Sequence, residues 1–434
     1  MEADVIPSPR RPEDTGLPFL FLADLAAKHF HAYGPQRLDE LAARLKLAPG
    51  TTEPLIEFLR RERLCEVSAG SNGAGPTFAL TDAGRRRAEN ALRHSQYAGA
   101  APVTLEAYST QVRFQRETES AVTRADARRA YHGVLVREAV LEQMGAAMNS
   151  RRAVFIYGPA GSGKTYLAER LAGVREDEVL VPHAILVGSH VIQVFDPQVH
   201  ECAPVAARAA PYLLRAASDE RWVRCHRPVV ITAGELTMEL LDLQFDHGSR
   251  TYAAPPQLKA NNGLLIVDDF GRQRVSAREL ANRWIVPLDR GIDYLALHTG
   301  EKFTAPFEVT VVFSSNLPPS TLADDSFLRR LGYKIHLGAL DEDLFRQLCL
   351  QVCASIGMRC TTAQIDYLIA RFRRERRPFL ACTPRDLLCQ VLDRARYQGV
   401  PPEPTEELLD WAWRNYFLTD LSQHLQHNLQ EVTS

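Results

Sequence analysis

The alternation of apolar and polar positions divides the chain into three regions. Residues 18–97 carry apolar positions at helical spacing, interrupted by two short alternating runs around a Gly-rich tip at 68–76. From residue 131, short continuous apolar runs alternate with helical segments, the pattern of strands buried on both faces of a parallel sheet. Beyond residue 341 the apolar spacing is helical. The sequence therefore predicts a small helical domain with a hairpin, an α/β domain and an all-α domain.

Changes in composition set the expected boundaries. The start of the chain is rich in proline and charge, and a second stretch before the α/β domain combines small residues with basic ones, so we expect both to be loose. The expected segments are a flexible start (1–17), a helical domain with a hairpin (18–97), a linker (98–130), an α/β domain (131–340), an all-α domain (341–422) and a polar tail (423–434).

The order of elements in residues 18–97 is that of a winged-helix domain, and "FALTDAGRRRA" resembles the end of bacterial winged-helix regulators. Eleven basic and nine acidic residues give this region a net charge of only +2. Glu53 and Glu57 lie at the exposed start of the third helix, where they would repel phosphates, and the Gly-rich tip has no Lys or Arg. The pattern favours docking of a protein over binding of DNA, and leaves DNA binding open.

The overall charge balance gives no indication of a nucleic-acid or membrane partner. With 51 basic and 53 acidic residues among 434, the net charge of −2 gives no global bias toward nucleic acid or an anionic membrane. No run approaches the roughly 20 apolar residues of a membrane span. The first residues lack the features of a signal peptide, so we expect a cytoplasmic protein.

The eight cysteines are expected to be reduced thiols. A zinc site built from Cys349, Cys353 and Cys360 is an alternative. However, Cys349 and Cys353 continue an apolar helical stripe, and no C-x2-C pair or close histidine supports a metal.

The stretch "GPAGSGKT" at residues 158–165 follows the apolar run "AVFIY" and precedes a helical pattern, the context that a phosphate-binding P-loop requires. Its glycines let backbone N–H groups converge on an anion next to the positive end of a helix. Lys164 would contact the β- and γ-phosphates of ATP, and the Thr165 hydroxyl would bind Mg²⁺. An ordinary Gly-rich turn is the alternative. The nucleotide-binding residues expected here are Gly158, Pro159, Ala160, Gly161, Ser162, Gly163, Lys164, Thr165 and Tyr166.

Two aspartates end the apolar run "LLIVDD". Burying two adjacent carboxylates is costly unless each has a partner. Asp268 fits the position that binds Mg²⁺ in P-loop NTPases, and Asp269 the position that orients the attacking water. A glutamate is more common at the second position, so the shorter side chain affects the expected rate rather than the reaction. A strand-end Asx turn is the alternative.

Five motifs in order, the P-loop, "LLIVDD", "VVFSSN", "FLRRLGYKI" and "TPRDLL", resemble the signature of AAA+ ATPases over residues from about 125 to about 420. The resemblance implies a P-loop AAA+ core with a parallel sheet, a C-terminal helical lid and a ring, most commonly a hexamer. ATP and Mg²⁺ are the implied cofactors.

The same resemblance implies roles for four further residues. Asn316 corresponds to sensor 1, which holds the attacking water, and Arg385 to sensor 2 at the start of a lid helix. Arg330 is similar to the arginine finger that enters the neighbouring subunit's site, with Arg329 a close second candidate. Each also has an ordinary explanation: a turn residue for Asn316, a solvated pair for the two arginines and a helix start for Arg385.

Two inserted segments indicate which branch of the AAA+ ATPases this sequence resembles. Alternating runs at 293–298 and 302–307 predict a β-hairpin that resembles the pre-sensor-1 hairpin of one AAA+ branch. The stretch from Glu235 to Gly263 resembles the helix-2 insertion of enhancer-binding activators, without their "GAFTGA" signature. Residues 183–195 predict another hairpin, either an exposed interaction module or a brace. Phe245, Tyr252 and His298 to Lys302 are expected to line a central pore, and His132 and Gly133 the adenine site.

The sequence thus predicts a cytoplasmic, Mg²⁺-dependent AAA+ ATPase that works as a homo-oligomeric ring and remodels a protein partner. The alternative is a DNA-acting ATPase, a helicase loader or a transcription-linked factor. A third possibility is a signalling ATPase whose nucleotide state sets its assembly.

Overall fold

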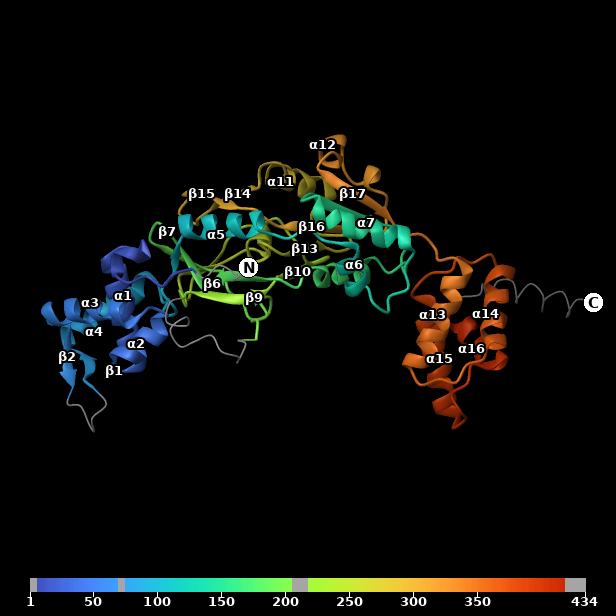
Figure 1. Cartoon of the computed structure of the whole chain (residues 1–434), viewed down its shortest axis with the longest axis horizontal. Coiled ribbons are helices and arrows are strands. Elements are labelled where there is room, and N and C mark those ends of the chain that lie inside the picture. The colour runs from blue at the N-terminus through green and yellow to red at the C-terminus, as the bar shows by residue number, and fades with distance from the viewer. Residues whose placement is uncertain (1–5, 69–74, 205–217, 418–434) are drawn as a thin grey trace, which may run out of the picture.

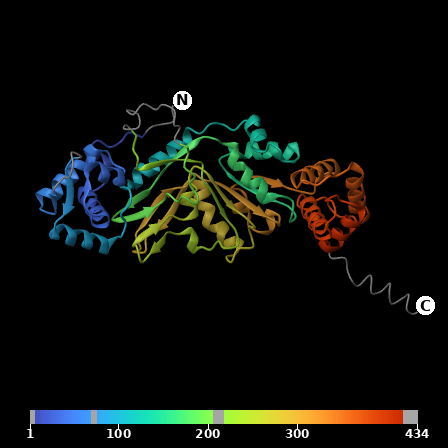
Figure 2. The ribbon, with the colours of Figure 1, turned by 90° about the horizontal axis from the view of Figure 1, so that it is seen from below.

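A computed structural model describes residues 6–68, 75–204 and 218–417, and most of the Gly-rich tip and the polar tail lie outside these ranges. The N-terminal domain, the α/β core and the C-terminal helices follow one another along the longest axis of the molecule (Figure 1). Seen from below, the two terminal domains flank the core on opposite sides (Figure 2). None of the helices in the described part of the chain has the length and apolar character that a bilayer crossing requires.

The N-terminal domain has the helices and the hairpin in the order expected from the sequence, with one additional short strand, β1, between the first two helices. The elements are α1 (Phe19–Tyr33), β1 (Gln36–Arg37), α2 (Leu38–Leu45), α3 (Pro49–Arg61), β2 (Cys65–Ser68), β3 (Thr77–Leu80) and α4 (Asp82–His94). The strands form a three-stranded sheet in the order β1-β3-β2. A proline in its first turn favours the start of α3, and the Thr81 side chain caps α4 by accepting a hydrogen bond from the Gly84 N–H.

Residues 6–17 are packed against the fold, which differs from the flexible start expected. They include the short helix η1 (Pro12–Thr15). Leu17 is buried with the apolar residues of α1 to α4, and Pro7 pairs with Ser218 in an isolated bridge. Proline and charge in this stretch therefore mark a turn-rich path over the surface of the fold.

The expected linker at 98–130 also folds. It contains β4 (Val103–Thr104), α5 (Leu105–Glu117) and α6 (Arg124–Ala130). Tyr108 and Val112 lie on one face of α5 and are buried in an apolar cluster. Two apolar residues at helical spacing among basic and polar neighbours were too weak a signal to identify this helix.

The α/β core is built on a five-stranded parallel sheet with the strand order β10-β13-β16-β5-β17. Its strands are β5 (Ala153–Tyr157), β10 (Val229–Thr232), β13 (Leu264–Val267), β16 (Thr310–Ser315) and β17 (Leu331–His336). Its helices are α7 (Glu138–Asn149), α8 (Lys164–Arg170), η2 (Leu171–Val174), α11 (Ala277–Arg290), η4 (Pro319–Thr321) and α12 (Asp325–Leu328). The helices α6, α7 and α8 pack on one face of the sheet, and α11 and α12 on the other.

A second sheet, formed largely by inserted segments, lies between the N-terminal domain and the core. Its strand order is β11-β12-β8-β7-β4. The inserted elements are β6 (Glu178–Pro182), β7 (Ala184–Val187), β8 (His190–Gln193), β9 (Trp222–His226), η3 (Glu239–Leu241), β11 (Gln244–Asp246), β12 (Thr251–Ala253), α10 (Pro256–Lys259), β14 (Ile292–Ala296) and β15 (Lys302–Pro306). Both hairpins predicted from alternating runs are confirmed, as β7–β8 and β14–β15.

The β7–β8 hairpin joins the two domains through its two faces. On β7, Leu186 packs into the apolar core of the N-terminal domain, whereas Ile185 packs into the core of the insert. On β8, Val191 and Ile192 divide in the same way. Successive side chains of a strand point to opposite faces, so one hairpin contributes to both cores. Of the two roles considered for this segment, the structure supports a brace that connects the two domains, and we call β7–β8 the brace hairpin.

A buried ion pair adds a polar connection at the same junction. The carboxylate of Asp219 accepts hydrogen bonds from the guanidinium of Arg221, with Nη2 at 2.8 Å from Oδ2. Arg221 Nη1 also donates to the carbonyl oxygens of Pro102, at 3.2 Å, and Thr15, at 3.4 Å. One side chain thus links the insert to both segments that were expected to be loose.

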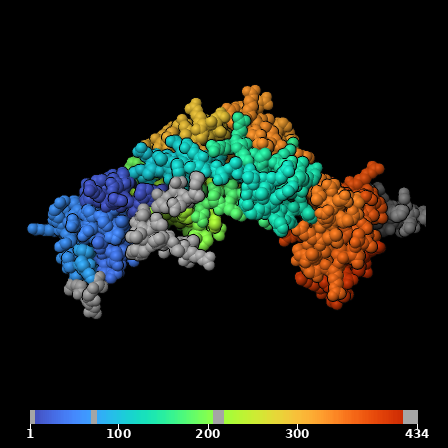
Figure 3. All heavy atoms as spheres, viewed as in Figure 1, coloured from blue at the N-terminus to red at the C-terminus, as the bar shows by residue number. Residues whose placement is uncertain are grey.

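Four helices form the C-terminal domain: α13 (Glu342–Ser355), α14 (Thr362–Arg374), α15 (Thr383–Gln398) and α16 (Glu406–Tyr416). The side chains of Asp341, Thr361 and Thr405 cap three of them. Cys349 and Cys353 are buried in the apolar core of this domain. In the space-filling view this domain lies at one end of the molecule, next to the core (Figure 3).

A buried amine in the N-terminal domain makes stability depend on pH. Lys28 is buried, and burial lowers its pKa to about 8 although Asp24 nearby raises it. In the unfolded chain this amine keeps its ordinary pKa of about 10.4, so between pH 8 and that value the unfolded state binds more protons than the folded state. The free energy of unfolding should therefore increase as the pH rises through this window, by on the order of 2 kcal/mol.

The measurement is urea denaturation at several pH values from 7 to 10. Lys28→Met should remove this part of the pH dependence, whereas Lys302→Met, which changes an exposed lysine, should keep it. Parallel profiles for wild type and Lys28→Met would show that Lys28 does not titrate in this way.

Candidate nucleotide site

The parallel sheet brings the predicted site residues together at one edge. The strands β5, β13 and β16 are neighbours in the order β13-β16-β5, and all three run in the same direction. The P-loop follows β5, Asp268 follows β13 and Asn316 follows β16. Carboxyl ends of parallel strands are where ligands bind in open α/β sheets.

The P-loop depends on two glycines for its path. At Gly158, a Cβ atom would lie 2.0 Å from the carbonyl oxygen of Leu337, so no larger residue fits. Gly163 has φ of +88° and caps α8, which begins at Lys164. A side chain would strain this left-handed conformation, which glycine adopts without cost. The close approach of Gly158 to Leu337, just after β17, and the turn at Gly163 into α8 together fix the path of the loop.

Lys164 reaches back over the loop that precedes it. Its side chain is buried, and Nζ donates to the carbonyl oxygens of Gly158, at 3.1 Å, and Pro159, at 3.0 Å. It also donates to Oδ1 of Asn316, at 2.7 Å. Burial lowers the pKa of this amine, while Asp269 and Asp268 act in the opposite direction.

Thr165 and Asp268 form the second contact of the site. The Thr165 hydroxyl lies 3.0 Å from Oδ1 and 2.9 Å from Oδ2 of Asp268. A hydroxyl and a carboxylate supply the hard oxygen ligands that Mg²⁺ prefers. The two residues therefore fit the metal position expected from the sequence.

Asp269 and Asn316 complete a connected set. Nδ2 of Asn316 donates to Oδ1 of Asp269 at 3.2 Å, so the amide of Asn316 links Lys164 to Asp269. Asp269 has φ of +48°, the left-handed region that aspartate and asparagine tolerate better than other non-glycine residues.

Gln273 holds this strained turn and was not identified from the sequence. It is buried, and its Nε2 donates to the carbonyl oxygens of Asp268, at 2.9 Å, and Asp269, at 3.3 Å. Its Oε1 accepts a hydrogen bond from the Gly271 N–H at 2.8 Å. A glutamine four residues after a motif carries no pattern that separates it from a surface residue.

The three candidate arginines have different surroundings. The guanidinium of Arg330 contacts both carboxylate oxygens of Asp289 in α11, at 2.9 and 2.5 Å, and also bonds Ser326. Arg329 and Arg385 are exposed, and no ion pair or hydrogen bond of either guanidinium occurs among the described residues. Arg330 was the first candidate for the finger, and here it is bound within its own chain.

The C-terminal domain contacts the loop that would hold phosphates. The N–H of Cys382 donates to the carbonyl oxygen of Gly161 at 3.0 Å. Gln351 Nε2 donates to the carbonyl oxygen of Gly133 at 2.7 Å, whereas His132 beside it is exposed. Arg385 therefore lies three residues beyond a direct contact with the P-loop.

The predicted pore residues differ in exposure: Tyr252 is buried, Phe245 is half-buried, and His298 to Lys302 are exposed. Tyr252 is fully buried, and its hydroxyl bonds His298, so the prediction that it lines a pore as an accessible aromatic is wrong. Phe245 stacks on the His298 ring with centroids 3.9 Å apart. These aromatic residues pack the second sheet against the β14–β15 hairpin.

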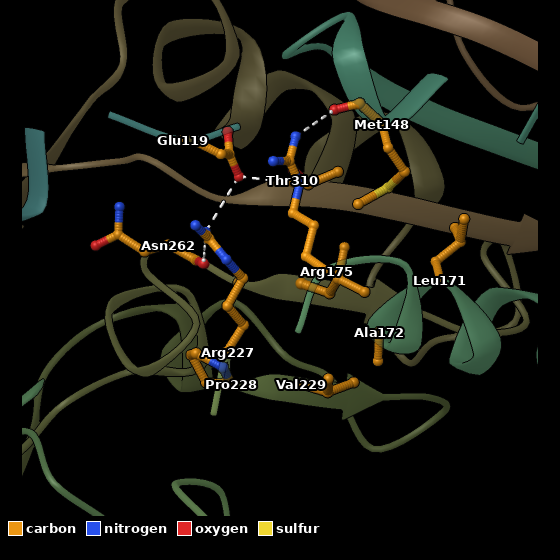
Figure 4. A pocket seen from close by; sticks show the side chains of 12 residues that line it. Glu119, Met148, Leu171, Ala172, Arg175, Arg227, Pro228, Val229, Asn262 and Thr310 are labelled. Carbon is orange, nitrogen blue, oxygen red and sulfur yellow. Dashed lines mark hydrogen bonds and ion pairs between the residues drawn. The ribbon is translucent and has the colours of Figure 1, made fainter. Parts of the chain in front are cut away.

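A small pocket lies at the opposite edge of the parallel sheet, where β10, β13 and β16 begin (Figure 4). Glu119 is buried there and forms ion pairs with Arg116, at 2.7 Å, Arg175, at 3.1 Å, and Arg227, at 3.1 Å. The cluster attaches the segment between α5 and α6 to the core. It lies away from the P-loop and was not predicted.

Comparisons with known proteins give family models that match parts of the chain and solved structures of low sequence identity. The family described as "Parvovirus non-structural protein NS1" matches residues 77–185, and a domain of unknown function, DUF8689, matches residues 341–415. No curated protein matches the chain. Among solved structures, RuvB from Thermotoga maritima, described as a Holliday junction branch migration motor, is 13% identical over 64% of this chain and 69% of that chain, with a TM-score of 0.37.

NtrX from Brucella abortus, solved in complex with ATP, is 13% identical over 62% of this chain and 54% of that chain, with a TM-score of 0.39. At these values the similarities add no argument about function, and the fold rests on the strands and contacts described above. The strands and contacts described above define an α/β core with a parallel sheet and a P-loop, followed by an all-α domain. This fold class, expected from the sequence, is confirmed.

Proposed function

We propose that this protein is a Mg²⁺-dependent ATPase of the AAA+ kind that hydrolyses ATP in an oligomeric ring to remodel a protein partner. The observation that carries the proposal is a pair of hydrogen-bonded groups of side chains at the carboxyl edge of the sheet. Lys164 bonds Asn316, which bonds Asp269, and beside them Thr165 bonds Asp268. These are the groups that phosphoryl transfer to water requires.

Each residue has a distinct task in this proposal. The N–H groups of the P-loop and the amine of Lys164 bind the phosphates of ATP. Thr165 and Asp268 would hold Mg²⁺, which when bound offsets the negative charge on the phosphates. Asp269 orients the attacking water and accepts its proton, and Asn316 fixes the Asp269 carboxylate through the hydrogen bond at 3.2 Å.

Asp269→Asn tests the chemistry without disturbing the turn, because asparagine tolerates φ of +48° and keeps the size of the side chain. The amide cannot accept the proton of the water, so kcat should fall by roughly 100-fold or more while the Kd for ATP changes little. Steady-state hydrolysis and equilibrium binding are the measurements.

Asp343→Asn is the matched control, since the Asp343 side chain is 90% exposed and its ion pair is with Arg346 of the same helix, which is not a residue of the site. It should keep the wild-type rate. A wild-type rate in Asp269→Asn would contradict the role of Asp269.

For the ring, Arg329 is the better candidate for the finger that enters a neighbour's site. Its guanidinium is exposed, whereas Arg330 is held by Asp289 in α11. In this proposal Arg330 fixes α12 against α11 and so presents Arg329 to the adjacent subunit. An arginine finger is worth roughly 10³ to 10⁵ in kcat in related chemistry.

Arg329→Ala should therefore bind ATP normally and lose most hydrolysis. Mixing it with a Lys164→Ala protein should restore part of the activity, because some interfaces then carry both intact residues. The ATPase rate per subunit of the wild type should fall on dilution, and Arg330→Ala should lower the melting temperature. Unchanged hydrolysis in Arg329→Ala, with a rate per subunit independent of concentration, would exclude the trans arrangement.

The choice of a protein partner rests on the N-terminal domain. Glu53 and Glu57 are exposed on α3, the helix that would enter a DNA groove if this domain acted as a winged-helix reader of DNA; because α3 begins at Pro49, they lie beyond its first turn and not at its start as expected. Two carboxylates there oppose contact with phosphates. The alternative is a DNA-acting ATPase that uses the same domain to bind DNA.

Stimulation of the ATPase by single- and double-stranded DNA separates these two functions. At physiological salt we expect less than twofold stimulation of the full-length protein by either DNA. Glu53→Gln/Glu57→Gln should strengthen weak DNA binding at low salt, since it removes two repulsive charges. Stimulation of several-fold at physiological salt would favour the DNA-acting function, and the hydrolysis measured with Asp269→Asn would still stand.

A further inference from the structure

Two cysteines face each other across an antiparallel pairing in the insert. Cys202 and Cys225, the latter in β9, are partners in an isolated β-bridge. The Ala203 N–H donates to the carbonyl oxygen of Arg224 at 3.0 Å, and the His226 N–H donates to that of Glu201 at 2.9 Å. These bonds flank the cysteines on both sides, so the two residues form a non-hydrogen-bonded pair.

That register sets the separation of the two backbones. Directly opposed residues of a non-hydrogen-bonded pair have Cα atoms about 4.5 Å apart, closer than in a hydrogen-bonded pair. Disulfides require Cα atoms roughly 4.4 to 6.8 Å apart and side chains that point toward each other. The register of this bridge therefore gives the pair a Cα separation of the kind that a disulfide requires.

The two thiols differ in their access to solvent. Cys225 is fully buried in the apolar cluster of the insert, and Cys202 is exposed. Burial and then the neighbouring Cys202 raise the pKa of the Cys225 thiol to about 12. Because the thiolate is the attacking species, a thiol with so high a pKa reacts slowly with reagents in solution. Cys202 is therefore the entry point for an oxidant.

We propose that Cys202 and Cys225 form a reversible disulfide by exchange with a small-molecule disulfide such as oxidised glutathione. The Cys202 thiolate attacks one sulfur of that molecule, forms a mixed disulfide and releases one thiol. Cys225 then loses its proton, attacks the Cys202 sulfur and displaces the second thiol. The protein loses two protons and two electrons, and the small disulfide gains them.

The bond would close the chain between residues 202 and 225 and lock β9 to the segment before it. β9 pairs along its length with β6, and Trp222 and Cys225 pack in the apolar cluster that also contains Ile185 of the brace hairpin. A cross-link that shortens the accessible unfolded chain raises thermal stability. The redox state of this pair would thus set the stability of the insert, independently of whether the P-loop hydrolyses ATP.

The test is thiol mapping of the full-length protein. After equilibration with excess oxidised glutathione, the sample is unfolded in acid with an alkylating reagent, digested and examined by mass spectrometry. We expect a cross-linked peptide that contains Cys202 and Cys225, reversed by dithiothreitol, and a higher melting temperature than in the reduced protein. Cys225→Ser should accumulate a mixed disulfide at Cys202. Cys65→Ser, which removes a buried cysteine in the N-terminal domain, should keep the cross-link.

Three results would overturn the proposal, and each can be obtained on wild-type protein even if a variant folds poorly. One is full alkylation of both thiols after oxidation. Another is a stable mixed disulfide at Cys202 with Cys225 still free. The third is a bond from either residue to another cysteine, such as Cys353 or Cys360, whose thiols are neighbours in the C-terminal domain.

Discussion

The direct pairing of β13 with β16 and of β16 with β5 is the constraint on which the candidate site depends. Each of the three strands is buried, so their register is fixed by side chains on both faces of the sheet. Lys164, Asp268 and Asn316 are far apart in the sequence, and they meet because each follows the end of one of these strands. A shift of one strand by one residue would separate the amide of Asn316 from Lys164 and Asp269.

This dependence explains which parts of the molecule the sequence predicted. A motif that follows a strand needs only local information, and the P-loop, the two aspartates and Asn316 were all identified in this way. Gln273 supports the same turn through its side chain, but its contribution depends on how the chain folds back, which no local pattern records. The difference in surroundings between Arg329 and Arg330 likewise depends on a residue in another helix, Asp289, which binds Arg330.

The segments that we expected to be flexible, but that fold, show a second limit of prediction from sequence: contacts between residues far apart in the chain leave no local pattern. The strand β4 consists of two residues and pairs with β7, about eighty positions later in the chain. Glu119 is surrounded by arginines from three separate stretches, so its charge is compensated only in the folded protein. A buried carboxylate in such a cluster looks like a solvated charge in the sequence. Tyr252 was misjudged for the same reason, since its partner His298 lies in another hairpin.

The brace hairpin shows how the N-terminal domain is attached. Leu186 and Val191 belong to the core of that domain, and Ile185 and Ile192 belong to the core of the insert. Separation of the domains would expose apolar side chains on at least one face of the hairpin, at a cost of roughly 1.5 to 3 kcal/mol for each fully buried residue. Arg221 adds a buried polar link to Thr15 and Pro102 at the same place. The N-terminal domain is therefore packed against the insert rather than joined to it by a flexible linker. The insert and the segment after α5 in turn contact the amino edge of the parallel sheet, where Glu119 is bound. A partner that binds the N-terminal domain would therefore bind a unit that extends to this edge of the sheet.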